Sequence, residues 1–242
     1  MRIALISDLH GNEVALRAVL ADARRAGVDR VVCLGDVATL GPRPNEVIAL
    51  LRELGCLCIV GNHDAFLLDR RLIAGYTEAE IVIEAVEWCR EQLTPEDFAF
   101  LRTFVPTAEL PLDGAGTLFL FHGSPRSHTE DLLATTAPEV LDEALRGISA
   151  TVLAGGHTHL QMLRQHRGAL LVNPGSVGMP FKQYVGGRTP EVLLHAEYAI
   201  VAADGGTVSV DLRRVPLDRA ALRAEAEATS NPFRVALMRQ YA

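Results

Sequence analysis

Five short segments carry histidine, aspartate and asparagine side chains of the kind that bind metal ions. They are Asp8-Leu9-His10, Gly35-Asp36, Gly61-Asn62-His63-Asp64, His122-Gly123 and Gly156-His157-Thr158-His159. These segments hold five of the eight histidines of the chain. Imidazole, carboxylate and amide ligands without thiolate suit Mn, Fe, Co, Ni or Zn better than copper or an iron–sulfur cluster. The segments therefore indicate a site for divalent metal ions.

The spacing within two of these segments favours convergence on metal ions. In an extended segment residues two apart point the same way, so Asp8 and His10 are expected to face one ion. The same spacing directs His157 and His159 toward neighbouring ions. A single segment of this type is more often a polar strand end or a capped turn. The presence of all five in one chain favours the metal site.

The elements that must position these segments alternate between strand and helix over the first third of the chain. Strands are expected at Arg2–Ser7, Arg30–Leu34 and Cys56–Val60, with helices at Glu13–Ala26 and Asn45–Leu54 between them. Asn12 is placed to cap the first helix, and Pro44 suits the first turn of the second. This βαβαβ pattern predicts parallel strands, and functional groups collect at the carboxyl ends of such strands.

The rest of the chain predicts further strands, helices and a tail. Strand patterns occur at Thr117–Phe121, Thr151–Ala154, Gln161–Gln165, Leu170–Val172, Val192–Val201 and Thr207–Arg213. We expect these later strands to be antiparallel because short turns separate them. Helices are expected near residues 65–104, where Thr94-Pro95-Glu96-Asp97 is a start signal, and at Pro138–Leu145. A chain of 242 residues is expected to form one domain, with a helical insertion near 65–104 and a helical tail near 217–242.

Composition and charge exclude several classes of protein. Apolar residues make up 49% and charged residues 22% of the chain, as in soluble globular proteins. The net charge of −7 provides no general basic surface, so we expect no stable binding to nucleic acid. No apolar run approaches the ~20 residues that span a bilayer, so a cytoplasmic protein without a membrane partner is expected. The oligomeric state stays open, and a homo-oligomer is compatible with the sequence.

The four cysteines are expected in the core. Cys33, Cys56, Cys58 and Cys89 lie among apolar residues, where a free thiol behaves as a small hydrophobe. Metal binding or a disulfide at Cys56 and Cys58 stays open, although a lone C-x-C lacks a zinc framework.

In their order the five segments resemble the pattern of the calcineurin-like metallophosphoesterases, which reads D-x-H, G-D, G-N-H-D/E, a G/H-rich turn and G-H-x-H. The resemblance spans residues 1 to about 180. Three longer stretches resemble the small prokaryotic phosphodiesterase branch, sometimes labelled diadenosine-tetraphosphatase-like. They are residues 35–47, 122–126 and 173–178. The resemblance implies an α/β fold, a four-layer αββα sandwich of two mixed β-sheets flanked by helices.

The same resemblance implies two divalent metal ions as cofactors, with Mn²⁺ expected and Fe, Zn, Co or Ni as alternatives. One ion would be held by Asp8, His10, Asp36 and His159, and the other by Asp36, Asn62, His122 and His157. Asp36 would bridge the two ions. The implied reaction is hydrolysis of small phosphodiesters or phosphomonoesters by attack of a metal-bound hydroxide.

His63 and Asp64 have expected catalytic roles by the same resemblance. His63 would protonate the leaving group or stabilise developing phosphoryl charge. Asp64 would orient or charge His63, although it is equally suited to cap the following helix.

Further residues are expected to contact the substrate phosphate. They are Asn12, Asn62, Arg43 and Arg126. Helix capping is the alternative for Asn12, and a solvated surface position is the alternative for each arginine. Phosphoprotein phosphatases of the superfamily read G-D-x-V-D-R-G, whereas this chain has Thr39 and Leu40 in place of the second Asp and the Arg. Protein phosphatase activity is therefore not expected.

Two other functions stay open from the sequence. Some proteins of this fold are scaffolds, metal-binding or metal-free, that bind a protein partner, but every ligand position is occupied here. A nucleotide-specific hydrolase would need a pocket for a base. Aromatic residues that could supply one are Phe66, Tyr76, Trp88, Phe181 and Tyr184, although aromatic residues are more often part of the core.

Overall fold

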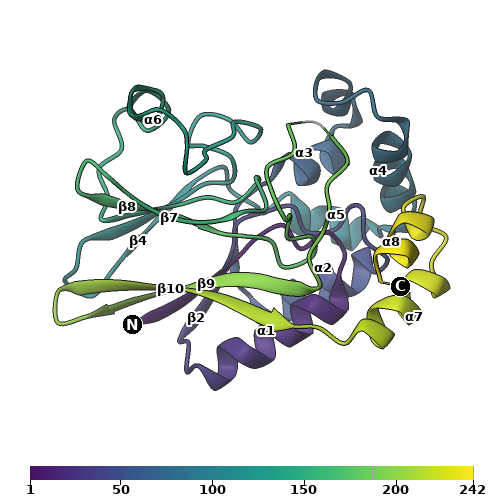
Figure 1. The fold of residues 1–242 in the computed structure, drawn as a ribbon, viewed down its shortest axis with the longest axis horizontal. Helices are drawn as coiled ribbons and strands as arrows, with labels where there is room; N and C mark the ends of the chain where they lie inside the picture. The colour runs from purple at the N-terminus through teal and green to yellow at the C-terminus, as the bar shows by residue number, and fades with distance from the viewer. Residues whose placement is uncertain (187, 242) are drawn as a thin grey trace.

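Two five-stranded mixed sheets pack face to face in the computed structural model, which describes residues 1–186 and 188–241 (Figure 1). The first sheet has the order β10-β9-β1-β2-β3 and the second the order β4-β5-β6-β8-β7. The strands of the first sheet are β1 (Arg2–Ile6), β2 (Arg30–Cys33), β3 (Leu57–Cys58), β9 (His195–Asp204) and β10 (Thr207–Pro216). Those of the second are β4 (Ala108–Pro111), β5 (Thr117–Leu120), β6 (Val152–Ala154), β7 (Gln161–His166) and β8 (Ala169–Pro174).

Strand direction differs in part from the expectation. Strands β1, β2 and β3 are parallel, as predicted. Strands β9 and β10 form an antiparallel hairpin that extends the first sheet. The prediction of antiparallel later strands is wrong for β5, β6 and β8, which are parallel. The reason is that a helix, α6 (Pro138–Ala144), connects β5 to β6, while β7 does not lie between β6 and β8 but pairs with β8 as an antiparallel edge strand. Strand β4, an edge strand that ends at Pro111, was not expected from the sequence.

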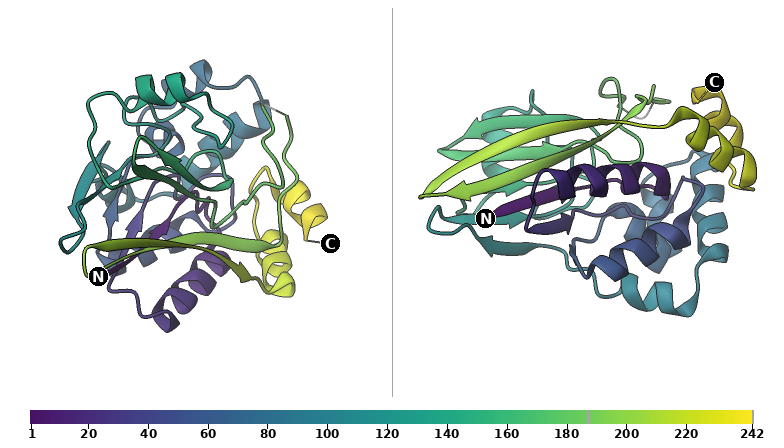
Figure 2. Two further views of the ribbon diagram at one scale, coloured as in Figure 1. Left: turned by 60° about the vertical axis from the view of Figure 1, so that its left-hand side comes forward. Right: turned by 90° about the horizontal axis from the view of Figure 1, so that it is seen from below.

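Some helices flank the two sheets, and the others gather at one end of the sandwich (Figures 1 and 2). The helices are α1 (Glu13–Arg25), α2 (Pro44–Leu54), α3 (Asn62–Leu68), the 3₁₀-helix η1 (Arg70–Gly75), α4 (Glu80–Gln92), α5 (Pro95–Leu101), α6 (Pro138–Ala144), α7 (Arg219–Ala228) and α8 (Arg234–Gln240). Helices α1 and α2 lie along the first sheet, and α6 lies on the far side of the second (Figures 1 and 2). The Asn12 side chain accepts a hydrogen bond from the Ala15 backbone amide at 3.0 Å, which confirms the predicted cap. Pro44 stands in the first turn of α2, also as predicted.

The alternation of side chains along β1 shows how the layers are held together. Ile3 and Leu5 point into the apolar core between the sheets. Ala4 and Ile6 point to the opposite face, into the core beneath the helices. A strand with both faces buried reads as a continuous apolar run, as this one does. The predicted α/β sandwich of two helix-flanked mixed sheets is confirmed.

The 65–104 segment and the tail lie at the same end of the molecule (Figure 2). Trp88 of α4 donates a hydrogen bond to the Ser230 hydroxyl at 3.0 Å. Leu222 and Leu237 of the tail pack in an apolar cluster with Val14 of α1. The expectation that all 242 residues form one domain stays a prediction that this packing favours. Among the described residues, no helix has the length and apolarity required to cross a bilayer.

Candidate metal centre

The predicted ligand segments meet at one edge of the sandwich because parallel strands end there together. Asp8 follows β1, Asp36 follows β2 and Asn62 follows β3 in the first sheet. His122 follows β5 and His157 follows β6 in the second. Since the two sheets pack face to face, loops from both reach the same space. The fold therefore places the five segments around a common centre.

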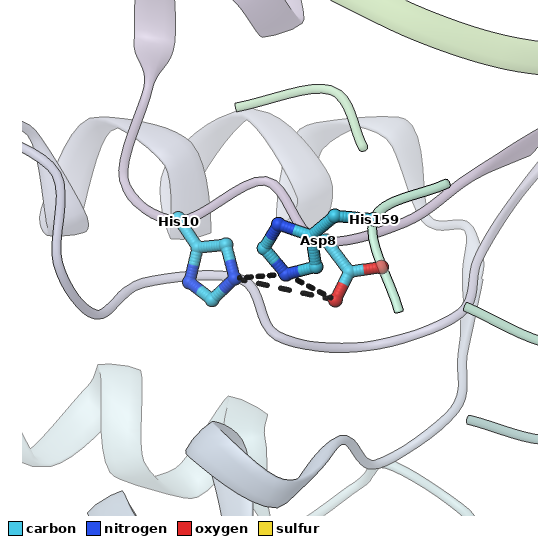
Figure 3. A group of neighbouring side chains, drawn as sticks. All are labelled: Asp8, His10 and His159. Atoms are coloured by element: carbon cyan, nitrogen blue, oxygen red, sulfur yellow. Dashed lines mark hydrogen bonds and ion pairs between the residues drawn. The ribbon is translucent and has the colours of Figure 1, made fainter. Parts of the chain in front are cut away.

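Asp8, His10 and His159 form what we term the first cluster (Figure 3). The Nε2 atoms of His10 and His159 are 3.1 Å apart. Asp8 Oδ1 lies 3.3 Å from His159 Nε2 and 4.0 Å from His10 Nε2. All three residues are buried. Three ligand atoms of buried residues thus face one point.

Asp36, His122 and His157 form the second cluster, in which each ligand atom lies within 4.8 Å of the others. His122 Nε2 is 3.4 Å from Asp36 Oδ2 and 3.1 Å from Asn62 Oδ1. The amide oxygen of Asn62 therefore faces the same point as the second cluster.

Two carboxylates connect the clusters. Asp36 Oδ2 lies 4.0 Å from His10 Nε2 of the first cluster, in addition to its contact with His122. Asp8 Oδ1 lies 4.0 Å from His122 Nε2 of the second cluster. Both carboxylates consequently lie between the clusters, and Asp36 has the position expected of a bridging ligand.

Backbone carbonyls set the orientation of two of the imidazoles. His122 Nδ1 is 2.6 Å from the Leu34 carbonyl oxygen, and His159 Nδ1 is 2.7 Å from that of Met179. Because a carbonyl oxygen only accepts, each Nδ1 must carry the proton and donate it. A neutral ring then directs the lone pair of Nε2 into the cluster, which is the arrangement found in metal-binding histidines.

Several buried polar atoms in the centre have no hydrogen-bond partner among the described residues. They include Asp8 Oδ1, His10 Nδ1, Asn62 Nδ2 and His63 Nδ1. A buried carboxylate oxygen without a donor is costly, since the desolvation of the charge is not offset. A divalent cation between Asp8, His10 and His159 would satisfy Asp8 Oδ1, so the donor set fits metal ions.

Burial and neighbouring charges oppose one another in setting the ionisation of the carboxylates. Burial alone would raise the pKa of Asp8, but His159 and His122 outweigh it and lower that pKa to about 2. Burial also opposes ionisation of Asp36, yet His122 holds its pKa well below the usual range. The two aspartates are therefore anionic at neutral pH.

The pKa values of His10 and His122 shift in opposite directions. Burial and His159 lower the pKa of His10 to about 3. Burial also disfavours a charged His122, but Asp36 overcomes this effect and raises its pKa to about 10. Positive charge is thus favoured between the carboxylates. A bound dication would supply that charge in place of the proton.

Most of the ligand residues have backbone conformations that L-amino acids rarely adopt. The φ angles are 54° at Asp8, 45° at His10, 57° at Asp36, 68° at His157 and 57° at His159. The expectation of extended D-x-H and H-x-H segments is therefore wrong. Left-handed turns, not strand alternation, direct these side chains inward. Each such residue costs about 1–3 kcal/mol, and strain of this kind concentrates at functional sites.

Glycine is required where the ligand loops touch. A Cβ atom at Gly61 would collide with the Asp36 carboxylate, and one at Gly156 would collide with the Ser7 hydroxyl. The glycines of the G-D, G-N-H-D and G-H-x-H segments thus allow the loops to approach closely.

Asp64 lies beneath the ligand loops. Its carboxylate accepts hydrogen bonds from the backbone amides of Gly61 and Asp36 at 2.8 Å and of Val37 at 3.0 Å. Burial and the neighbouring Asp36 raise its pKa to about 6. These bonds join the loop after β2 to the loop after β3, and they favour the capping alternative over direct orientation of His63.

His63 is buried beside the first cluster, and its ring centroid is 5.2 Å from that of His10. On the other side it contacts Phe66 at a centroid distance of 5.3 Å. Its catalytic role stays a prediction, to which its position next to the ligands lends support.

The other residues expected to bind substrate are already engaged in contacts. Asn12 uses both polar atoms, since Oδ1 caps α1 and Nδ2 donates to the Gly178 carbonyl at 3.1 Å. Arg43 is paired with Glu225 of the tail.

Arg126 is paired with Glu130, and its Nη1 lies 3.5 Å from Glu143. Neither arginine therefore approaches the clusters as an unpaired cation.

Three further residues support the site. Ser176 donates a hydrogen bond to the Asp8 carbonyl at 2.7 Å and accepts one from the Met179 amide at 2.8 Å. Asn173 donates to the Gly156 carbonyl at 2.6 Å. Both residues belong to the stretch 173–178 that carries the family resemblance, and their contacts reach segments far away in the sequence.

The third residue, Asp131, lies at the outer side of the second cluster. Its Oδ1 is 3.4 Å from His157 Nε2, and its Oδ2 accepts a hydrogen bond from the Tyr184 hydroxyl at 2.7 Å. No motif in the sequence marks this residue.

Comparison with known proteins agrees with this arrangement. The calcineurin-like phosphoesterase superfamily domain matches residues 1–196. An uncharacterized protein of Methanocaldococcus jannaschii is 31% identical over 193 residues, which cover 74% of this chain and 76% of that protein.

Two solved structures share the fold over nearly the whole chain. A metallophosphoesterase from Sphaerobacter thermophilus is 29% identical, with a TM-score of 0.76 over 100% of this chain and 98% of that one. A hypothetical protein from Pyrococcus horikoshii OT3 is 19% identical, with a TM-score of 0.81 over 98% of this chain and 96% of that one. The chain belongs to the calcineurin-like phosphoesterase superfamily.

Proposed function

We propose that this calcineurin-like phosphoesterase hydrolyses small phosphodiesters or phosphomonoesters with the help of two divalent metal ions. The observation that carries the proposal is the joint position of the two clusters, with Asp36 Oδ2 within 4.0 Å of an imidazole nitrogen in each. A carboxylate in that position can bind two ions at once. The superfamily to which the chain belongs indicates a phosphoesterase.

The ligands proposed for the first ion are Asp8, His10, Asp36 and His159, and those for the second are Asp36, Asn62, His122 and His157. When bound, two such ions would supply Lewis-acid chemistry, since they would neutralise phosphoryl charge and lower the pKa of a water molecule. Mn²⁺ is the ion that we propose, with Fe, Zn, Co and Ni as alternatives that the same ligands accept.

The protein itself contributes orientation and charge. The Leu34 and Met179 carbonyls hold the rings of His122 and His159 with Nε2 directed inward. Asp64 fixes the backbone on both sides of Asp36. The ligand atoms are thereby held in place before the substrate arrives, which lowers the cost of reorganisation.

His63 is proposed to act at the ester oxygen that leaves. It lies next to His10 but outside both clusters, and its Nδ1 has no partner among the described residues. An imidazole in this place can donate a proton to a departing alkoxide or a hydrogen bond to a charged phosphoryl oxygen.

Elemental analysis and hydrolysis together test the proposal. Protein prepared with added Mn²⁺ is expected to bind two ions per chain and to hydrolyse bis(p-nitrophenyl) phosphate, p-nitrophenyl phosphate or both. Asp113→Asn is a suitable control, because this aspartate lies in the exposed turn after β4 and, among the described residues, its one ion pair is with the N-terminal amine. This control variant is expected to keep both its metal and its activity. Inactivity of the metal-loaded parent on both esters would overturn the proposed hydrolysis, and failure to bind metal would favour a scaffold that binds a protein partner.

A further inference from the structure

A cavity of about 510 Å³ opens beside the second cluster. Asn62, the proposed amide ligand, forms part of its wall, and Ser124 extends that wall two residues beyond His122. The volume is within the range of about 300–1,000 Å³ that is common for small-molecule sites. A bare phosphate bound at the metal centre would leave this space unfilled.

One wall of the cavity is aromatic. Phe66 and Tyr76 line it with ring centroids 5.3 Å apart. Tyr76 is 43% exposed, and its ring centroid lies 6.4 Å from that of His157 in the second cluster. A partly exposed ring beside a proposed ligand offers a face for a planar group, in the offset geometry that aromatic pairs favour.

The opposite wall is polar but carries no unpaired cation among the residues that the structure describes. It is formed by residues 124–129, with Arg126 as its only arginine or lysine. Glu130 and Glu143 both pair with that guanidinium. A second phosphate would therefore have no unpaired positive charge to bind here. An uncharged group does not need such a charge and would lose little binding energy.

His63 lies beside the cavity as well as beside the first cluster. Its ring centroid is 5.2 Å from that of His10, 5.3 Å from that of Phe66 and 6.3 Å from that of Tyr76. The substituent of an ester oxygen that faces His63 would therefore lie against the aromatic wall.

We infer that the cavity between Tyr76 and residues 124–129 binds an ester substituent of the substrate phosphate, and that this substituent is planar, uncharged and of aryl or nucleoside size. The inference rests on the proposed hydrolysis and narrows its substrate class. Tyr76 is the residue that determines this specificity, and a polyphosphate chain is excluded from the cavity by its charge.

Two monoesters that each carry a single substituent test the inference. Phenyl phosphate and methyl phosphate differ only in the group assigned to the cavity. Tyr76→Ala is expected to lower kcat/KM for the phenyl ester by ~3–10-fold, because a stacking contact is lost. The methyl ester should change less than twofold. Comparing each variant with its parent cancels the different intrinsic reactivities of the two esters.

Further variants separate the cavity from a general structural effect. Tyr76→Phe keeps the ring and should therefore keep the preference for the phenyl ester that Tyr76→Ala loses. Ala65→Phe on α3 adds a ring to the wall of the cavity. This variant should also lower kcat/KM for the phenyl ester more than for the methyl ester. Leu163→Ala, at an exposed position on β7 outside the cavity wall, should change neither ester. Equal losses on both esters in Tyr76→Ala and Ala65→Phe would overturn the inference.

A binding measurement distinguishes failure of the inference from failure of the proposed function. Calorimetric titration of the Mn²⁺-loaded protein with phenyl phosphate and methyl phosphate requires no turnover. Tighter binding of phenyl phosphate that is lost in Tyr76→Ala would support the cavity even if the protein hydrolysed neither ester. Equal affinities for the two ligands in the parent would overturn the cavity assignment, whatever the activity.

Discussion

The two clusters are built from similar side chains but differ in their surroundings. All three members of the first cluster, Asp8, His10 and His159, are buried and have left-handed backbone. In the second cluster, the His157 side chain is as buried as that of His159, at 6% against 8% exposed, but the carboxylate of Asp131 lies 3.4 Å from its Nε2. The cavity also opens on this side, next to Asn62. The clusters therefore differ in their neighbours, an outer carboxylate and a cavity beside the second, and not in the depth of their ligands.

The largest effect is expected from removing the carboxylate that the two clusters share. Asp36→Asn is expected to deplete both metal sites and to lower activity by more than ~10²-fold, because loss of outer contacts to a metal site alone costs about 10–100-fold. Elemental analysis and kcat/KM on an aryl diester measure the two effects. Metal content equal to that of the parent would contradict the bridging role.

The next test asks whether His63 belongs to either cluster. His63→Ala is expected to keep both ions but to lose ~10²–10⁴-fold on alkyl esters, whose leaving group needs a proton. The loss on nitrophenyl esters should be smaller, because nitrophenolate leaves without one. Equal losses on both leaving groups would assign His63 to charge stabilisation. Depleted metal would make it a ligand.

A supporting residue of the first cluster offers a way to separate the clusters. Ser176→Ala removes the hydroxyl that holds the Asp8 carbonyl and the Met179 amide. Metal affinity of the first cluster is expected to fall ~10–100-fold, with the second little changed. Titration with Mn²⁺ should then show one tight and one weakened site. An equal weakening of both sites would show that the clusters bind metal as one unit.

The smallest effect is expected from Asn12, which lies close to the first cluster but is not part of it. Asn12→Ala should destabilise the protein by about 1 kcal/mol, the usual cost of a lost helix cap. Metal content and kcat/KM should stay within twofold of the parent, as measured beside a chemical denaturation curve. A large loss of activity with unchanged stability would instead assign Asn12 to substrate binding.

Much of the site was predictable because its chemistry depends on residue type and order. The ligand segments follow apolar runs, and the predicted strands at residues 2–7 and 30–34 are present with boundaries shifted by one residue. Local patterns also predicted the Asn12 cap and the first-turn Pro44, because capping depends on neighbouring residues alone. Strand direction in the second sheet was not predictable in this way, since it depends on which strand β8 pairs with.

The sequence alone determined which side chains could bind metal, and its resemblance to a known family implied that an α/β sandwich would carry them. Only the tertiary structure decided how they meet. The left-handed turns at Asp8 and His159 direct the ligands inward, although the spacing suggested extended chain. The pairing of Arg43 with Glu225 joins residues far apart in sequence and withdraws an expected phosphate contact. Such contacts depend on long-range packing, because the energy that holds a strained backbone or selects an ion pair comes from segments that local patterns do not include.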